Sequence, residues 1–326
     1  MKYRQLGRSG LRVSEVSLGS WLTLGSSVDR EGTREIVHRA YELGINCFDT
    51  ADVYARGEAE EAIGRALRAF ARRHLVIASK CFFPMSEHPN DRGLSRKHIV
   101  ESVEASLERL GMEYLDLHQC HRPDPSTPLE ETVCAYEDLI RRGKLLYWGV
   151  SEWPAPLIAE ACRIADARNA YRPVSNQPQY SLLRRGIEHE VIPVCEREGL
   201  GLLAFSPLAQ GVLSGKYAAG AAPAGSRATD DARNRFMKDL LRPENVAKAA
   251  EIAPLARGLG VSMPQLALAW CLRQPNVSSV IIGVTGTSQL EENVRASGLE
   301  LPGDVLERLD ALLPAPSVSG SAGQPR

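Results

Sequence analysis

The sequence predicts an α/β protein of the (β/α)8 TIM barrel class, with a small hairpin before the barrel and a long loop after its seventh strand. Short apolar runs rich in β-branched residues alternate with longer amphipathic stretches. This alternation is typical of parallel strands that are buried on both faces and separated by helices. There are eight such runs, and seven of them recur at the spacing of one βα unit, about 30 to 40 residues. The chain length of 326 residues is also common for one such barrel.

Each expected strand is bounded by glycine, proline or polar residues. The strands are expected at 14–20, 45–50, 75–80, 114–120, 145–151, 173–179, 201–207 and 278–284. Eight βα units without a second core segment favour a closed barrel. An open doubly wound sheet is the alternative, but the first strand-to-helix turn lacks the G-x-G-x-x-G pattern of such folds.

Residues 33–44 and 96–111 show the apolar periodicity of helices. In the second segment the apolar side chains repeat on one face, Ser95 precedes the segment as a predicted N-cap, and Gly111 follows as a stop signal. The connections therefore predict helices between the strands.

Three segments differ from the repeating βα pattern: the first residues, a long loop near the end of the barrel, and the last residues. Residues 3–16 predict a hairpin that turns at 8–10 and caps the bottom of the barrel. The gap between the last two strands contains the long loop, 209–241, which is rich in glycine and alanine. We expect one barrel domain over 1–313 and a disordered tail over 314–326, because the tail is rich in proline, serine and glycine.

Composition excludes several classes of function. The formal net charge of -1 does not favour nucleic acid or an anionic membrane as a partner. No apolar run approaches the roughly 18 residues that span a bilayer, and the first residues do not form a secretory signal. The seven cysteines are scattered and form no Cys-x-x-Cys pair, which predicts reduced thiols and a cytoplasmic location.

Polar residues stand at the C-terminal ends of most of the expected strands, where barrel enzymes have their active sites. They are Asp49 with Asp52 and Tyr54 after it, Lys80, His121, Ser151, Asn176 with Gln177, and Ser206. Packing of the hydrophobic core does not explain why so many buried strands end in polar residues.

A lysine at the end of a buried strand needs a counter-charge, and Asp49 is the natural partner of Lys80. A tyrosine beside that lysine should have a lowered pKa and serve as a general acid, while His121 orients a substrate oxygen. The alternative is a structural Asp49–Lys80 ion pair, with Tyr54 on the surface and His121 as a capping group. His118 and His121 also suggest a metal, but residues three apart on a strand face opposite sides, and no carboxylate–histidine motif accompanies them.

Several motifs resemble the aldo-keto reductase superfamily. They are FDTADVY, LVIASK, YLDLHQCH and VIIGVTGTSQLEEN. RGLSRKHIVESVEASLERL, HRPDPSTPLEETV and SPLAQGVLSGKY are similar to the branch that includes the voltage-gated potassium-channel β-subunits and their bacterial homologues. The resemblance runs in order from about residue 3 to residue 313 and implies a cytoplasmic oxidoreductase on a TIM barrel.

The family's catalytic tetrad corresponds to Asp49, Tyr54, Lys80 and His121. The resemblance implies that a nicotinamide hydride passes to the carbonyl carbon of an aldehyde or ketone while Tyr54 protonates the oxygen. Lys80 would lower the pKa of Tyr54, Asp49 would hold Lys80, and His121 would position the carbonyl. The channel β-subunits have an amide side chain at the position of His121, and this difference favours a catalytic role here.

The resemblance also implies a binding site for NADP(H), covered by the long loop after strand seven. Its implied residues are Ser20, Trp21, Asp49, Ser151, Gln177, Phe205, Ser206, Pro207, Leu208, Ala209, Gln210, Ser214, Lys216, Arg227, Gly283, Thr285, Gln289, Glu292 and Asn293. A glycine-containing loop that opens a helix after 278–284 suits a phosphate. Basic residues that hold the 2′-phosphate in many members are absent near Thr285 and Gln289, so Lys216 and Arg227 are expected to supply that charge, and NADH remains an alternative.

The expected substrate pocket is apolar, which suits small aldehydes, aromatic ones included. Its expected walls are Trp21, Phe82, Phe83 and Trp153, with Met85 as a further candidate. The function expected from the resemblance is reduction of a small carbonyl substrate. The alternatives are an NADP(H)-binding, redox-sensing regulatory subunit of a channel or transporter, and a dehydrogenase that runs toward alcohol oxidation. Tetramers and octamers occur in this branch, so a homo-oligomer is an expectation from the resemblance alone.

Overall fold

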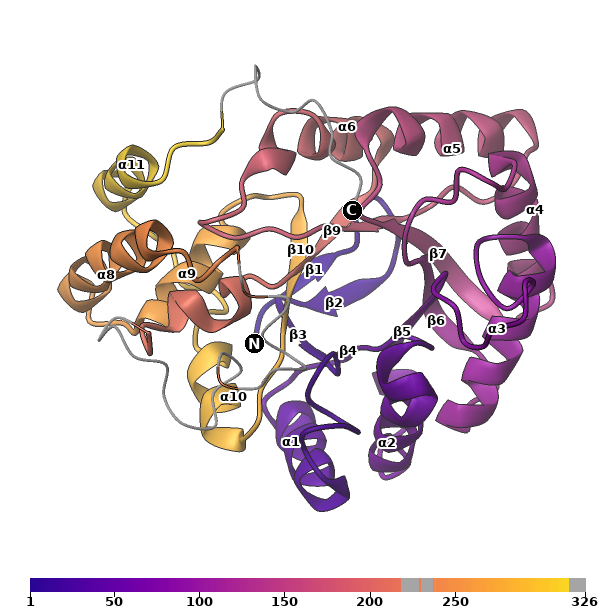
Figure 1. Cartoon of the computed structure of the whole chain (residues 1–326), viewed down its shortest axis with the longest axis horizontal. Helices are drawn as coiled ribbons and strands as arrows, with labels where there is room; N and C mark the ends of the chain where they lie inside the picture. Colours follow the sequence, from indigo (N-terminus) through magenta and orange to yellow (C-terminus); the bar gives the residue numbers. More distant parts are fainter. Residues whose placement is uncertain (218–228, 230–236, 238, 317–326) are drawn as a thin grey trace.

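The computed structural model describes residues 1–217, 229, 237 and 239–316. Within these residues, eight parallel strands close into a barrel in which each strand pairs with the next one along the chain and the last pairs with the first (Figure 1). The strands are β3 (Val16–Gly19), β4 (Cys47–Asp49), β5 (Val76–Cys81), β6 (Leu115–Cys120), β7 (Leu145–Ser151), β8 (Ser175–Gln177), β9 (Gly201–Phe205) and β10 (Val277–Ile282). The predicted barrel class is confirmed, and the open-sheet alternative is wrong.

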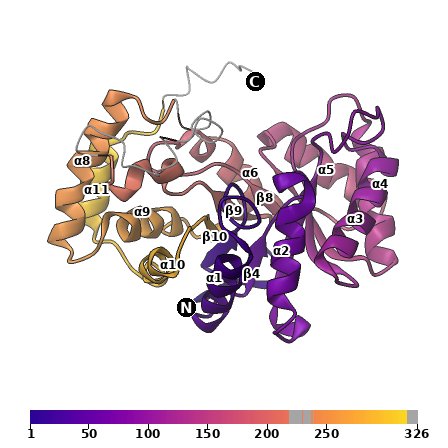
Figure 2. The ribbon, with the colours of Figure 1, turned by 60° about the horizontal axis from the view of Figure 1, so that its bottom comes forward.

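Helices surround the barrel, because a connection between parallel neighbours has to cross back over the sheet. Those in the described part of the chain are α1 (Arg30–Glu42), α2 (Glu58–Leu67), α3 (Arg96–Leu110), α4 (Leu129–Arg141), α5 (Ala155–Ala167), α6 (Val191–Glu198), α8 (Pro243–Gly258), α9 (Met263–Leu272), α10 (Thr287–Val294) and α11 (Gly303–Leu312). Figures 1 and 2 show α8 and α11 side by side on the flank away from α3 and α4. The apolar faces of these helices cover the outside of the barrel.

Helix α3 shows how local sequence sets the boundaries of an element. The Ser95 side chain accepts a hydrogen bond from the backbone N–H of His98, which satisfies one of the free donors of the first turn. The helix ends at Gly111, whose φ of 67° lies in the left-handed region that glycine adopts without strain. Both predicted boundary residues are confirmed.

The hairpin of β1 (Tyr3–Gln5) and β2 (Arg12–Ser14) is antiparallel, as predicted. Leu6 and Val13 of this hairpin are fully buried in a small apolar cluster with side chains from the strands. The strand members of this cluster are Cys47, Val76, Ala78, Leu117, Leu203 and Ile281. Gly7 approaches the chain before β9 so closely that an added Cβ would lie 2.3 Å from the carbonyl oxygen of Gly199. The hairpin therefore packs against the barrel strands through a close backbone contact.

Several predicted strands are longer than the observed ones. The pattern at 173–179 forms only the three residues of β8, because Pro173 and Pro178 have no N–H for the ladder. The expectations for 218–228, 230–236, 238 and 317–326 lie outside the described residues. Among the described helices, none has the length and apolarity needed to cross a bilayer.

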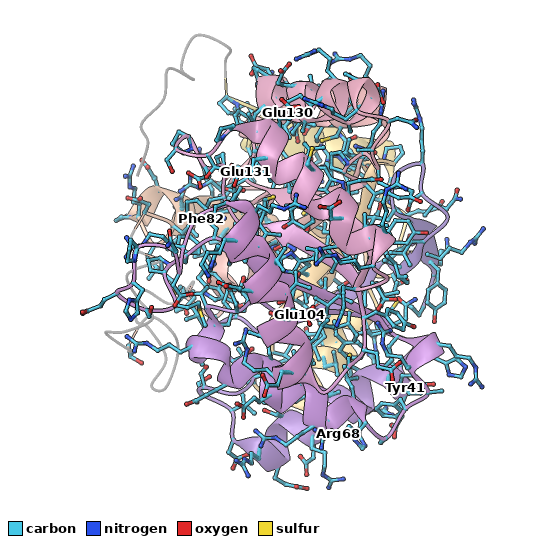
Figure 3. The ribbon with its side chains drawn as sticks, turned by 90° about the vertical axis from the view of Figure 1, so that its right-hand side faces the viewer. Tyr41, Arg68, Phe82, Glu104, Glu130 and Glu131 are labelled. Carbon is cyan, nitrogen blue, oxygen red and sulfur yellow. The ribbon has the colours of Figure 1, made fainter. Side chains whose placement is uncertain are left out.

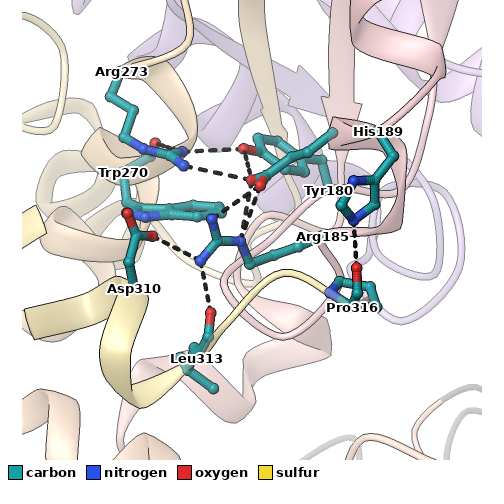
Figure 4. A network of polar contacts seen from close by, with 9 residues as sticks. Tyr180, Arg185, His189, Trp270, Arg273, Asp310, Leu313 and Pro316 are labelled. Atoms are coloured by element: carbon teal, nitrogen blue, oxygen red, sulfur yellow. Dashed lines mark hydrogen bonds and ion pairs between the residues drawn. The ribbon is translucent and has the colours of Figure 1, made fainter. Parts of the chain in front are cut away.

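A buried ionic network joins the segment after β8 to α9 and α11 (Figure 4). Arg185 donates hydrogen bonds to Asp310 Oδ1 at 2.7 Å and to the Leu313 carbonyl at 2.6 Å, and it forms an ion pair with Glu188. Glu188 also accepts a hydrogen bond from the Tyr180 hydroxyl at 2.6 Å. The side chains of Arg185 and Glu188 are only 8% and 14% exposed, so each charge depends on the other.

We predict that Glu188→Gln lowers the free energy of unfolding by about 1 to 3 kcal/mol, because it leaves the buried Arg185 guanidinium without its carboxylate. Chemical denaturation followed by circular dichroism measures this change. The control is Glu160→Gln, which removes an exposed ion pair with Arg163 and should leave the midpoint nearly unchanged. Equal effects of the two substitutions would contradict a stabilising role of the network.

Candidate active site

Four side chains from neighbouring strands and loops meet at the C-terminal end of the barrel. Asp49 is the last residue of β4, Lys80 lies near the end of β5, and His121 directly follows β6. Tyr54 begins η1 (Tyr54–Gly57), the short helix after β4. The parallel register explains the convergence, because β4, β5 and β6 are consecutive neighbours and all end at the same edge.

Lys80 lies at the centre of this cluster and is fully buried. Its ammonium has three N–H donors. They point to Asp49 Oδ1 at 2.7 Å, to the Thr50 carbonyl oxygen at 2.7 Å and to the Tyr54 hydroxyl at 3.4 Å. Burial alone would lower the pKa of Lys80, but the Asp49 carboxylate raises it above its ordinary value. The lysine therefore remains a cation with its full donor capacity used.

Asp49 connects this cation to the opposite side of the barrel. Its Oδ2 accepts a hydrogen bond from Gln177 Nε2 of β8 at 2.8 Å, while Oδ1 binds Lys80. The carboxylate thus holds both side chains at fixed positions. The neighbouring Asn176 is buried near the Cys195 thiol, because adjacent residues on a strand face opposite sides.

The Tyr54 hydroxyl lies between Lys80 and His121, at 3.5 Å from His121 Nε2. Burial raises the pKa of Tyr54 above its ordinary value, although the charge of Lys80 acts in the opposite direction. The expectation of a lowered pKa is therefore wrong in its net direction, because the desolvation of a buried phenolate outweighs the attraction of the lysine. Tyr54 consequently holds its proton at neutral pH and can donate it.

His121 is a neutral imidazole in this site. Burial lowers its pKa well below the ordinary value, and the charges of Lys80 and Arg122 act in the same direction. Its ring stands edge-on to Phe83 with a centroid separation of 4.9 Å. His118, three residues earlier, instead bonds to Tyr136 Oη at 2.9 Å in the helix layer. The two histidines therefore occupy different environments.

Asp52 is a buried carboxyl whose role the sequence did not reveal. Its Oδ2 accepts a hydrogen bond from Ser102 Oγ of α3 at 3.0 Å, and its backbone N–H donates to the Lys80 carbonyl at 3.2 Å. Burial and the nearby charge of Glu60 raise the pKa of Asp52 to about 7. These contacts fix the loop that carries Tyr54 to both α3 and β5. Only the position of Asp52, two residues before Tyr54, could have suggested this.

Strained backbone gathers at this end of the barrel. Non-glycine residues with φ between 47° and 60° are Leu22, Ala55, Arg56, Glu152, Ser206, Ala209 and Gln210, all in loops that follow strands. Among the described residues, only Asn169 has such a backbone elsewhere. Left-handed backbone in residues with a Cβ costs energy and is concentrated at functional sites in proteins. The strain therefore marks the same end as the polar cluster.

The described cofactor candidates outside the tetrad lie at the ends of β3, β7, β8, β9 and β10 or in the segments that follow these strands. Ser151 donates its hydroxyl to the Gln177 carbonyl at 2.9 Å, and Gln210 bonds to Ser206 Oγ at 2.5 Å. After β10, Gln289 Oε1 accepts from the Thr285 N–H at 3.0 Å. The remaining candidates outside the tetrad are Ser20, Trp21, Phe205, Pro207, Leu208, Ala209, Ser214, Lys216, Gly283, Glu292 and Asn293, while Arg227 lies outside the described residues.

The side chains expected to line the substrate pocket differ in their exposure to solvent. Phe82 and Phe83 are half-buried and stand edge-on to each other at 5.3 Å, and Trp21 is also half-buried. Trp153 is only 2% exposed, and its indole N–H has no partner in the described structure. Figure 3 shows Phe82 near one end of the barrel and Tyr41, at the end of α1, near the other. Phe83 contacts the tetrad through the His121 ring, as described above.

Comparison with known proteins assigns the family. The sequence profile of the Aldo/keto reductase family matches residues 15–314, and the chain therefore belongs to this family. Membership indicates an oxidoreductase.

Three relatives of high identity are named as channel subunits and not as enzymes. The chain is 44% identical to a "Probable voltage-gated potassium channel subunit beta" of Oryza sativa subsp. japonica, over 96% of this chain and 97% of the relative. It is 46% identical to a protein of the same name from Arabidopsis thaliana, over 91% of each chain. A "Putative voltage-gated potassium channel subunit beta" of Schizosaccharomyces pombe is 42% identical over 95% of this chain and 93% of the relative.

The buried histidine behind the site predicts a pH-dependent stability. Burial lowers the pKa of His118 from 6.5 to about 3, so the folded state requires the neutral ring. Its contribution is present above pH 6.5 and is lost as the pH falls from 6.5 toward 3, because the unfolded chain binds the proton first. We predict that the destabilisation caused by His118→Gln becomes smaller by about 2 kcal/mol between pH 7.5 and pH 5.

Urea unfolding at the two pH values measures this difference. Tyr136→Phe is the matched control, because it removes the hydrogen bond but keeps the imidazole, so its cost should change little with pH. If His118→Gln lowers the free energy of unfolding by the same amount at both pH values, the histidine has the same pKa in the folded and unfolded states.

Proposed function

We propose that this chain is an NADP(H)-dependent aldo-keto reductase that reduces the carbonyl group of an aldehyde or ketone. The observation that carries the proposal is the buried Lys80 ammonium, which bonds the Tyr54 hydroxyl beside a neutral His121. A protonated phenol next to a fixed cation suits the protonation of an oxygen that gains negative charge. Membership of the aldo/keto reductase family supports the same reaction.

The proposed roles follow from the contacts of each side chain. His121 binds and orients the carbonyl oxygen, and Tyr54 gives its proton to that oxygen. Lys80 stabilises the phenolate that remains, and Asp49 keeps Lys80 charged and in place. When bound, the reduced nicotinamide supplies the hydride that reaches the carbonyl carbon, so one hydride and one proton complete the alcohol. By microscopic reversibility the same residues serve alcohol oxidation.

The residues present fit a nicotinamide carboxamide. Gln177 uses its Nε2 on Asp49, which leaves Oε1 as an acceptor, and the Ser151 oxygen can accept after donating to the Gln177 carbonyl. Two acceptors suit the NH2 group of a carboxamide. These residues would hold the nicotinamide end beside the tetrad.

The phosphate end also has a fitting environment. The segment 206–210 has left-handed backbone at Ser206, Ala209 and Gln210, and α10 begins after Gly286 without a side-chain cap. Free N–H groups of a first helical turn bind anions. We propose that the pyrophosphate lies along 206–210, that the adenosine end lies near α10, and that Lys216 supports NADPH over NADH. The buried free cysteines support a reducing, cytoplasmic location.

We predict that Tyr54→Phe lowers turnover of an aldehyde by roughly 10² to 10⁴, because the proton donor is lost. NADPH oxidation with an aromatic aldehyde measures the turnover, and quenching of protein fluorescence by NADPH should show that cofactor binding is retained. The control is Tyr171→Phe, which removes an exposed hydroxyl before β8 and should not affect turnover. Full activity of the Tyr54 variant would exclude this mechanism.

The names of the relatives favour a second candidate function, an NADP(H)-binding regulatory subunit of a potassium channel. Tight NADPH binding without carbonyl turnover, together with co-purification of a channel subunit from native cells, would support it. His121 favours the reductase, because a neutral imidazole beside the Tyr54 hydroxyl suits the positioning of a carbonyl oxygen.

A further inference from the structure

Arg122 places a positive charge next to the tetrad. It directly follows His121, and its Nη1 donates a hydrogen bond to the His121 carbonyl at 2.6 Å. The guanidinium carbon lies 5.6 Å from the centre of the Phe83 ring, and that ring contacts His121. Burial dominates the pKa of Tyr54 and of His121, but the charge of Arg122 also acts on both and favours lower values. The guanidinium therefore lies close to the reacting groups.

This half-buried cation has no carboxylate partner within 4.0 Å in the part of the chain that the structure describes. Asp124, two residues later, is occupied by other donors. Its oxygens accept hydrogen bonds from Leu94 N at 2.7 Å, Ser126 N at 2.9 Å and Thr127 Oγ1 at 2.8 Å. A guanidinium carries five N–H donors, and only one of them bonds to a described acceptor, the His121 carbonyl. Arg122 thus retains the donors that would hold an anion.

The phosphates of a dinucleotide are not the natural partner of this arginine. Arg122 follows β6, whereas the proposed phosphate contacts follow β9 and β10. In the barrel order, β6 is four strands from β10 in either direction, so the two positions lie across the barrel from each other. The remaining candidate is an anionic group on the substrate itself.

We propose that Arg122 binds a carboxylate or phosphate group of the substrate, so that the natural substrates are aldehydes or ketones with a negative charge. This inference rests on the proposed reductase function and names its substrate class. A guanidinium binds either anion through two parallel hydrogen bonds. The adjoining Phe83 ring excludes water from one side and so strengthens such a contact. The carbonyl would then lie between Tyr54 and His121, with the anion toward the loop after β6.

Matched substrates test this proposal on the complete protein. The 2-, 3- and 4-formylbenzoates carry a carboxylate, and their methyl esters lack the charge and differ otherwise by one methyl group. We expect kcat/KM for the preferred acid to exceed that for its ester by roughly 10- to 100-fold, the range for a charge-assisted contact. Arg122→Met should abolish this preference, and Arg122→Lys should restore part of it.

A control variant separates local from general charge effects. Arg92→Met changes the net charge equally, but Arg92 is exposed on the loop after β5 and should keep the preference for the acid. The kcat/KM ratio of 4-formylphenyl phosphate to 4-methoxybenzaldehyde, set against the ratio of 4-formylbenzoate to its methyl ester, shows whether phosphate or carboxylate is the better anion. An acid-to-ester ratio near one, or a fall with both substrates alike in Arg122→Met, would overturn the proposal and leave a structural role for Arg122.

Binding distinguishes this inference from the reductase proposal. Calorimetry should show that 4-formylbenzoate binds the unaltered protein in the presence of NADP+ at least tenfold more tightly than its methyl ester, and that Arg122→Met loses this difference. If no carbonyl compound is turned over but this difference is found, the reductase proposal fails and the anion site stands. If the esters are reduced as well as the acids, the reductase stands and the anion site fails.

Discussion

The three N–H donors of the buried Lys80 ammonium need protein acceptors, and this requirement determines how the residues at the C-terminal end of the barrel are arranged. Each N–H needs an acceptor from a different position, and the acceptors are Asp49, the Thr50 carbonyl and Tyr54. All three lie on one chain segment at the end of β4, which is next to the strand that carries Lys80. Solvation of a single charge thus determines where the Tyr54 hydroxyl lies, and in the proposed reaction this hydroxyl sets the position of the substrate oxygen.

The apolar cluster of the hairpin and the polar, strained residues lie at opposite ends of the barrel axis. The hairpin packs an apolar cluster against the barrel strands, and the helices cover its outside. The opposite end contains left-handed residues and buried polar groups, both of which cost stability. The ionic network of Arg185 and Glu188 joins the outer segments beside this end. Apolar packing in the hairpin cluster and under the helices therefore offsets the cost of the left-handed and buried polar residues at the other end.

The fold could be predicted from sequence because each element has a local signal. Strands showed β-branched runs, α3 showed a cap and a stop, and the spacing of the units indicated closure. The grouping of Asp49 with Lys80 followed from the cost of an unpaired buried lysine. The catalytic roles assigned to the four tetrad residues remain predictions.

Other features depend on distances that no local pattern contains. The net direction of the shift in the Tyr54 pKa is set by the burial of the phenol, whereas the residue pattern indicated only the neighbouring cation, Lys80. The contact of Asp52 with Ser102 could not be predicted, because it depends on how α3 packs against the loop after β4. Arg122 stands in a motif that resembles the channel β-subunit branch, but only the three-dimensional arrangement shows that no carboxylate of the described residues lies within 4.0 Å of it.

The decisive measurement for the proposed reductase is fluorescence titration of the purified protein with NADPH and NADH, followed by cofactor oxidation with a panel of aromatic and aliphatic aldehydes. We expect saturable binding of NADPH and formation of one alcohol for each NADPH consumed. Failure to bind either nucleotide would contradict it, because the tetrad would then have no source of hydride.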